Sequence, residues 1–171
     1  PTQVEGLYQV EIGPQVMFVT GDGRFLIDGA IVDLKTREDI TESARGKARL
    51  RAIDTLGEDN MIVFDAPNSK QIGAYADEGI SVHYMFYPRT GLNTPSYDKA
   101  VAVWCADDQQ KALTDAKNGE KIDSEKCANP VEKQMELGEL MGIRGTPAIV
   151  LDNGEMIPGY VEPKKLAALL E

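Results

Sequence analysis

The chain has 171 residues, of which 42% are hydrophobic, enough for the packed core of one domain or of two small ones. Its 28 acidic residues outnumber its 18 basic residues and give a net charge of −10, so we expect no nucleic-acid partner. No apolar run has the length of a membrane span. Pro1 in place of methionine indicates a processed chain from which any targeting signal has been removed.

The first 40 residues are predicted to form a small β-rich unit. Apolar and polar side chains alternate over residues 8–33, as they do in strands, and Gly21-Asp22-Gly23 has the composition of a hairpin turn. Residues 30–32 predict one more short strand. A unit of this size buries little surface by itself, and small domains often become stable by oligomerising. We therefore expect a homodimer formed by two of these units.

From Thr41 the pattern becomes helical, but it is unusually polar. Ala44, Ala48 and Ile53 recur near helical spacing, and basic residues fill much of the remaining surface. Such a helix often crosses solvent between two domains. Residues 42–56 are thus predicted as a linker helix, and the alternative is a poorly packed surface helix of a single domain.

The rest of the chain, from residue 59 to 171, alternates strand and helix patterns and is predicted to be an α/β domain. Strands are expected at 61–64 and 80–87. Thr94-Pro95 starts a helix whose apolar face extends from Ala100 to Leu113. Asn129-Pro130 starts another, which ends at Gly142, and residues 163–170 form the last one.

The most informative stretch is Gly145–Leu151, where Thr146-Pro147 opens a short apolar strand. Asn153-Gly154 then predicts a tight turn into a second strand, before the final helix. This order is similar to the second half of the thioredoxin fold, in which a cis-proline loop lies beside a redox-active Cys-x-x-C. By itself, Thr146-Pro147 is more simply interpreted as an ordinary loop proline before an edge strand, since most X-Pro bonds are trans. The sequence contains no Cys-x-x-C.

Two cysteines, Cys105 and Cys127, lie 22 positions apart. Their spacing leaves three interpretations open: two buried free thiols, one structural disulfide that closes a loop, or a reactive thiol. The single histidine, His83, stands within an apolar strand pattern and is predicted to be packed or partly buried instead of catalytic. With so few ligands we expect no metal site, and no motif for a cofactor is present.

Taken together, these segments resemble the DsbC-type periplasmic thiol:disulfide interchange proteins over nearly the whole chain. The stretches that carry the resemblance are Val19–Gly23, Met61–Pro67, Tyr87–Leu92, Val103–Ala106 with Cys127, and Gly145–Leu151 with Val161. The resemblance implies an α+β fold in three parts. These are a β-rich dimerisation domain (residues 1–40), a linker helix (41–58) and a thioredoxin-like domain (59–171).

The resemblance also implies a location, a set of partners and several residue roles. The protein would be a periplasmic homodimer without a cofactor. It would act on misfolded disulfide-containing proteins, and a membrane thiol reductase would keep it reduced. Cys105 and Cys127 would form a structural disulfide in this oxidising compartment. The backbone of Thr146 would pair with an extended substrate, while the ring of Pro147 would keep the catalytic thiolate accessible.

One part of the family pattern is missing. Ala66–Lys70 runs directly into Gln71–Ile80, which resembles the back half of the catalytic helix, so roughly twenty residues are absent between Lys70 and Gln71. Loss of a central strand would leave its neighbours unpaired. We therefore expect the complete protein to carry a Cys-x-x-C there, with a true deletion as the alternative.

The expected function is that of a disulfide isomerase or reductase that reshuffles non-native disulfides by thiol–disulfide exchange. The alternative is a redox-silent chaperone or peptide-binding module that truly lacks the dithiol. A third possibility is a thioredoxin-like domain with an unrelated structural role.

Overall fold

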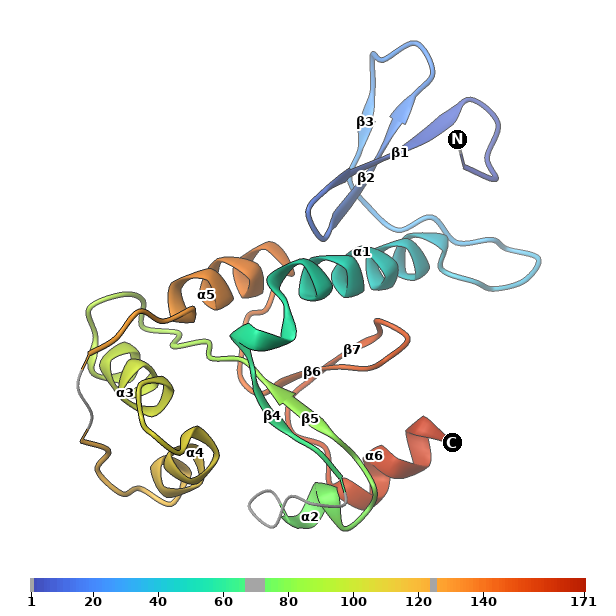
Figure 1. Cartoon of the computed structure of the whole chain (residues 1–171). Coiled ribbons are helices and arrows are strands. Elements are labelled where there is room, and N and C mark those ends of the chain that lie inside the picture. The colour runs from blue at the N-terminus through green and yellow to red at the C-terminus, as the bar shows by residue number, and fades with distance from the viewer. Residues whose placement is uncertain (1, 67–72, 124–125) are drawn as a thin grey trace. The chain divides into compact units, whose positions relative to one another are not determined.

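A computed structural model describes residues 2–66, 73–123 and 126–171 and has an α+β fold (Figure 1). The chain divides into two compact units. The first contains Pro1–Thr55 and Glu139–Gly159, and the second contains Leu56–Gly138 and Tyr160–Glu171. The first unit therefore combines the expected β-rich segment and helix with a hairpin from the C-terminal part of the chain.

The first unit begins with an antiparallel sheet of β1 (Leu7–Ile12), β2 (Gln15–Thr20) and β3 (Leu26–Ile27). The predicted turn at Gly21–Gly23 is present, because the Thr20 N–H donates to the Phe25 carbonyl at 3.0 Å. The further strand expected at 30–32 is reduced to a single bridge between Val32 and Asp39. The buried core of this part comprises Leu7, Val16, Phe18, Ala44 and Ala48.

The predicted linker helix is α1 (Ile40–Leu56), but its expected exposure to solvent is wrong. Its buried residues are Thr41, Ala44, Gly46, Ala48 and Arg49. Ala44 and Ala48 belong to the core with the β1–β2 sheet, whereas Gly46 lies against the Asn153-Gly154 turn. Small side chains allow close packing without the apolar bulk that marks an amphipathic helix, so the sequence pattern concealed the burial.

The second unit contains a 3-10 helix, η1 (Glu58–Asn60), and a sheet made of β4 (Ile62–Phe64) and β5 (Val82–Tyr84). Its helices are α2 (Gly73–Ala76), α3 (Pro95–Trp104), α4 (Gln109–Lys117), α6 (Pro163–Leu170) and most of α5 (Val131–Leu140). Their core is a cluster of buried side chains: Ile62, Phe64, Phe86, Ala100, Val101, Val103, Ala112, Leu113, Val131 and Met135.

The single helix expected from Thr94 to beyond Leu113 is two helices. The helix starts as predicted, with Thr94 as N-cap and Pro95 in the first turn. It then ends at Trp104, and Asp108 caps α4 by accepting a hydrogen bond from the Lys111 N–H at 2.9 Å. Because an N-cap aspartate satisfies a free helical N–H, it starts a new helix at this point.

The C-terminal strands, β6 (Ala148–Val150) and β7 (Met156–Pro158), form the predicted hairpin in the first unit. Among the described strands, β4–β5 and β6–β7 are separate antiparallel pairs that share no strand. No helix in the described part of the chain is long and apolar enough to cross a membrane.

Candidate functional site

The loop before β6 presents Thr146 and Pro147 at the surface. Both residues are exposed, and the peptide bond between them is cis. The Pro147 carbonyl accepts a hydrogen bond of 2.8 Å from the Gly159 N–H, which joins the loop to the residue that follows β7. The loop is therefore attached to both strands of the hairpin and remains open to solvent.

The opposite end of the hairpin is closed by the Asn153-Gly154 turn. The Leu151 N–H donates to the Glu155 carbonyl at 2.9 Å, and the Asn153 side-chain oxygen accepts from the Glu155 N–H at 2.8 Å. Gly154 has a φ of 84°, a region that glycine enters without steric cost. These bonds fix the register of β6 on β7.

The expected Cys-x-x-C position, between Lys70 and Gln71, lies outside the described residues. Directly after it, α2 is held by Tyr75, whose hydroxyl donates to the Val161 carbonyl at 2.7 Å. Burial, and next the neighbouring Tyr160 hydroxyl, raise the pKa of Tyr75, so this phenol stays protonated as a donor. The remnant of the expected catalytic helix is thus tied to the segment that leads into α6.

The two cysteines form one disulfide between Cys105, at the C-cap of α3, and Cys127. The Cys127 N–H also donates to the Cys105 sulfur at 3.1 Å. Because the sequence has two cysteines and both are in this bond, the 171-residue chain has no free thiol. Thiol–disulfide exchange begins with attack by a thiolate, so these residues alone supply no nucleophile.

His83 is more exposed than expected, because its side chain is 42% accessible. It lies in β5, and its Nδ1 is 3.8 Å from a carboxylate oxygen of Glu58. The short strand turns this side chain outward, so the expected packing is wrong. Within the described residues no group of histidine, cysteine, aspartate and glutamate side chains is arranged to hold a metal ion.

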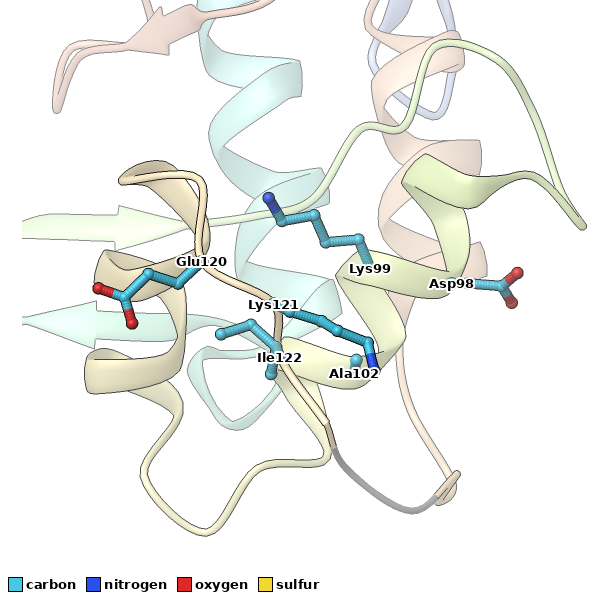
Figure 2. Close-up of a pocket in the computed structure, with 6 residues that line it drawn as sticks. All are labelled: Asp98, Lys99, Ala102, Glu120, Lys121 and Ile122. Carbon is cyan, nitrogen blue, oxygen red and sulfur yellow. The ribbon is translucent and has the colours of Figure 1, made fainter.

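A pocket of about 430 Å³ lies between α3 and the segment after α4. Figure 2 shows two acidic, two basic and two apolar residues around it: Asp98, Lys99, Ala102, Glu120, Lys121 and Ile122. The lysines already have partners, since Lys99 donates to the Ala116 carbonyl and Lys121 pairs with Asp123, both at 2.7 Å. With mixed charges and paired cations, this pocket offers no group for exchange chemistry.

Two residues that support the site were missed by sequence reasoning, namely Tyr75 and Arg49. Arg49 is 6% exposed and contacts the hairpin turn. In the sequence it is one of several regularly spaced basic residues of the helix, and nothing distinguishes it from Arg45 or Arg51. Only the fold shows which arginine is buried.

Two family models match the chain. Residues 48–171 match a thioredoxin-like domain, and residues 1–42 match the N-terminal domain of disulfide bond isomerase proteins. Together they agree with the expected α+β fold, which has an N-terminal DsbC dimerisation domain and a thioredoxin-like domain.

Similar proteins were found among curated sequences and solved structures. The thiol:disulfide interchange protein DsbC of Dickeya dadantii is 33% identical over 177 residues, which covers 91% of this chain and 72% of that protein. The Escherichia coli (strain K12) protein of the same name is 30% identical over 190 residues, covering 100% of this chain and 79% of that protein. A crystal structure of a disulfide interchange protein from Neisseria gonorrhoeae superposes with a TM-score of 0.51 and 28% identity, covering 67% of this chain and 88% of the other.

Proposed function

The chain belongs to the DsbC family of thiol:disulfide interchange proteins, and we propose that the complete protein rearranges non-native disulfides with a Cys-x-x-C inserted between Lys70 and Gln71. The family consists of disulfide isomerases, which are thiol:disulfide oxidoreductases. One observation carries this proposal: the two cysteines of the chain are joined to each other, so neither is available as the nucleophile. We therefore assign the nucleophile to the inserted segment.

The missing segment is supported by the length of the match. The alignment with the Escherichia coli relative extends over 190 residues, whereas this chain has 171, a difference of 19. That difference agrees with the roughly twenty residues expected for one strand, its loop and the start of a helix.

The proposed chemistry begins at the first cysteine of that segment. A thiolate at a helix N-terminus has a lowered pKa and is substantially ionised near neutral pH. It attacks one sulfur of a substrate disulfide and releases the other sulfur as a substrate thiolate. That thiolate then attacks a different disulfide of the substrate and displaces a second substrate thiolate. The second thiolate attacks the mixed disulfide between enzyme and substrate, which forms a new substrate disulfide and releases the enzyme thiolate. The number of disulfides stays the same, so the reaction is an isomerisation.

Thr146 and Pro147 are proposed to bind the substrate beside this thiolate. Their exposure leaves the Thr146 backbone available to an extended peptide, which could add to the loop as a short strand does. Cys105 and Cys127 are proposed to act in stability alone, by joining the end of α3 to the chain before α5.

The assembly is proposed to be a periplasmic homodimer. Its parts are a dimerisation domain at 1–40, a linker helix at 41–58 and a thioredoxin-like domain at 59–171. Tyr8, Ile12, Phe25 and Leu26 are exposed on the N-terminal sheet or beside it, with accessibilities of 48%, 57%, 56% and 62%. An apolar surface of this kind favours association. Its other partners would be misfolded disulfide-containing proteins and a membrane thiol reductase.

A second function is favoured by the absence of a free thiol. If the natural chain truly lacks the segment, the same loop would serve a redox-silent chaperone or peptide-binding module, because binding through the Thr146 backbone needs no cysteine.

Peptide mapping of the natural protein separates the two functions. We expect a peptide with roughly twenty additional residues between Lys70 and Gln71, which raise the mass of that part of the chain by about two kilodaltons. The reduced protein should then reactivate scrambled ribonuclease A, and replacement of the first cysteine of the segment should abolish this. The matched replacement Cys105→Ser should lower stability and preserve turnover at low temperature. A peptide in which Lys70 is followed directly by Gln71, together with no reactivation, would reject the isomerase.

A further inference from the structure

The turn of the β6–β7 hairpin lies unusually close to α1. A methyl group on Gly154 would collide with the Gly46 carbonyl oxygen. A methyl group on Gly46 would lie 3.3 Å from the Asn153 carbonyl oxygen. This approach explains why a glycine stands inside the helix, where it costs about 1 kcal/mol relative to alanine. The two glycines let the backbones touch.

Beside this contact, Arg49 joins the helix to the same turn. Its Nη1 donates to the Gly154 carbonyl at 3.0 Å and to the Glu42 carboxylate at 2.6 Å. A buried charge is costly unless it is paired and hydrogen-bonded. Glu42 therefore fixes the guanidinium in place, and the second bond reaches across to the hairpin. Gly46, Arg49 and Gly154 are called the helix–hairpin contact below.

The hairpin connects the turn that α1 holds to the Thr146–Pro147 loop at its opposite end. Its register pairs Val150 with Met156 next to the turn and Ala148 with Pro158 next to the loop. Strands rise by about 3.3 Å per residue, so Pro147 and Thr146 lie about 10–13 Å along the chain from Val150, the last residue of β6 before the turn that α1 holds. A change in the direction of the turn would redirect the loop as well.

We propose that Arg49 is a positioning residue for substrate binding, because the helix–hairpin contact sets the direction in which the Thr146–Pro147 loop meets an extended polypeptide. This inference rests on the proposed role of that loop. It assigns to α1 a function beyond connecting two domains, since the same helix packs on the N-terminal sheet and holds the substrate-binding hairpin.

The first test is hydrogen exchange of the full chain by NMR. In Arg49→Met, the Leu151 and Gly159 amides should exchange about tenfold to a hundredfold faster than in the parent, because a charge-assisted bond to the hairpin is lost. The control is Arg51→Met in the same helix. Arg51 pairs with Glu11 of β1 instead, so its loss should leave the hairpin amides unchanged.

The second test is binding of a fluorescein-labelled, reduced and alkylated ribonuclease A, followed by anisotropy. Arg49→Met should raise the Kd about threefold to tenfold, since a smaller fraction of the molecules holds the loop in the orientation that binds the polypeptide. Arg49→Lys keeps the charge and should restore part of the affinity. It also serves as the test variant if Arg49→Met does not fold.

A glycine pair provides an independent check. Gly154→Ala places an alanine in a left-handed backbone conformation and also makes its methyl group collide with Gly46. Gly142→Ala places an alanine at a similar φ of 76°, but its methyl group would have nothing within 4 Å. Only the first should accelerate exchange in the hairpin.

The outcomes are distinct. Equal hairpin exchange in Arg49→Met and Arg51→Met would overturn the proposal, and so would faster exchange with an unchanged Kd. If the parent chain does not bind the unfolded polypeptide, the proposed function of the loop fails, and with it the role in substrate binding. The exchange data would still decide whether Arg49 holds the hairpin.

Discussion

Replacing Gln134 with leucine should destabilise the second unit more than any comparable change on its surface. Gln134 lies in α5 and is 2% exposed. Its side-chain oxygen accepts a hydrogen bond of 2.7 Å from the Phe86 N–H, and its nitrogen donates at 2.6 Å to the Asn60 carbonyl. One amide thus satisfies two backbone groups from distant parts of the chain.

The size of the effect follows from the two groups that leucine would leave unpaired. A buried donor or acceptor without a partner costs about 1–3 kcal/mol, so the substitution should cost about 2–6 kcal/mol. Leucine has nearly the volume of glutamine, so little cavity energy is added. Domains of ordinary size have a free energy of unfolding of about 5–15 kcal/mol. The loss is therefore a large part of the total.

Urea unfolding followed by circular dichroism measures the effect. With a slope of about 2 kcal/mol/M, the midpoint should fall by about 1–3 M. Gln110→Leu is the matched control, since the Gln110 side chain donates to the Val63 carbonyl in an exposed position where water can replace it. Its cost should stay below about 1 kcal/mol. Equal shifts in the two variants would refute the reasoning.

Three further predictions concern other parts of the chain. Replacing Cys105 and Cys127 together with serine should lower the free energy of unfolding by about 3 kcal/mol, as expected for a loop of this length, and thiol reagents should label neither cysteine in the native, unreduced protein. Leu26→Glu on β3 should shift sedimentation from dimer to monomer, whereas Leu169→Glu, which is similarly exposed on α6, should not. Hydrogen bonds from the Thr20 hydroxyl and the Arg24 N–H hold the pKa of Asp22 below its ordinary value of 3.8. The bonds of this carboxylate therefore stabilise the turn above about pH 4 and are lost as the pH falls through the lowered folded-state pKa. Amide shifts of the turn should follow that loss as the pH falls below about 4, and Asp22→Ala should remove the transition.

The local starts and ends of elements could be predicted from the sequence where one residue type determines the backbone. Thr94-Pro95 predicted the start of α3, and the Asn153-Gly154 turn predicted the β6–β7 hairpin. The break between α3 and α4 was missed, because nothing in the sequence marked Asp108 as the N-cap that it is in the structure. A cap and a solvated carboxylate have the same sequence signal.

Contacts between distant segments could not be predicted in the same way. The exposure of Thr146 and Pro147 agrees with their expected position in a loop. By contrast, the burial of Arg49 depends on a hairpin about a hundred residues away. The burial of Gln134 depends on the Asn60 carbonyl at the end of η1 and on the Phe86 N–H shortly after β5. Polar residues in such positions look like surface residues, because hydrophobic periodicity reports burial only for apolar side chains.

The contact between α1 and the hairpin also sets an order in which the chain can fold during synthesis. Arg49 and Gly154 are 105 positions apart. At about 5–20 residues per second, the ribosome needs roughly 5–20 seconds to reach the hairpin after it has made the helix. During that interval Gly46 and Arg49 have no hairpin to contact, and a helix with an interior glycine is weak by itself. The N-terminal unit therefore completes its packing late, and the nascent chain depends on its C-terminal part to finish a domain that begins at its first residues.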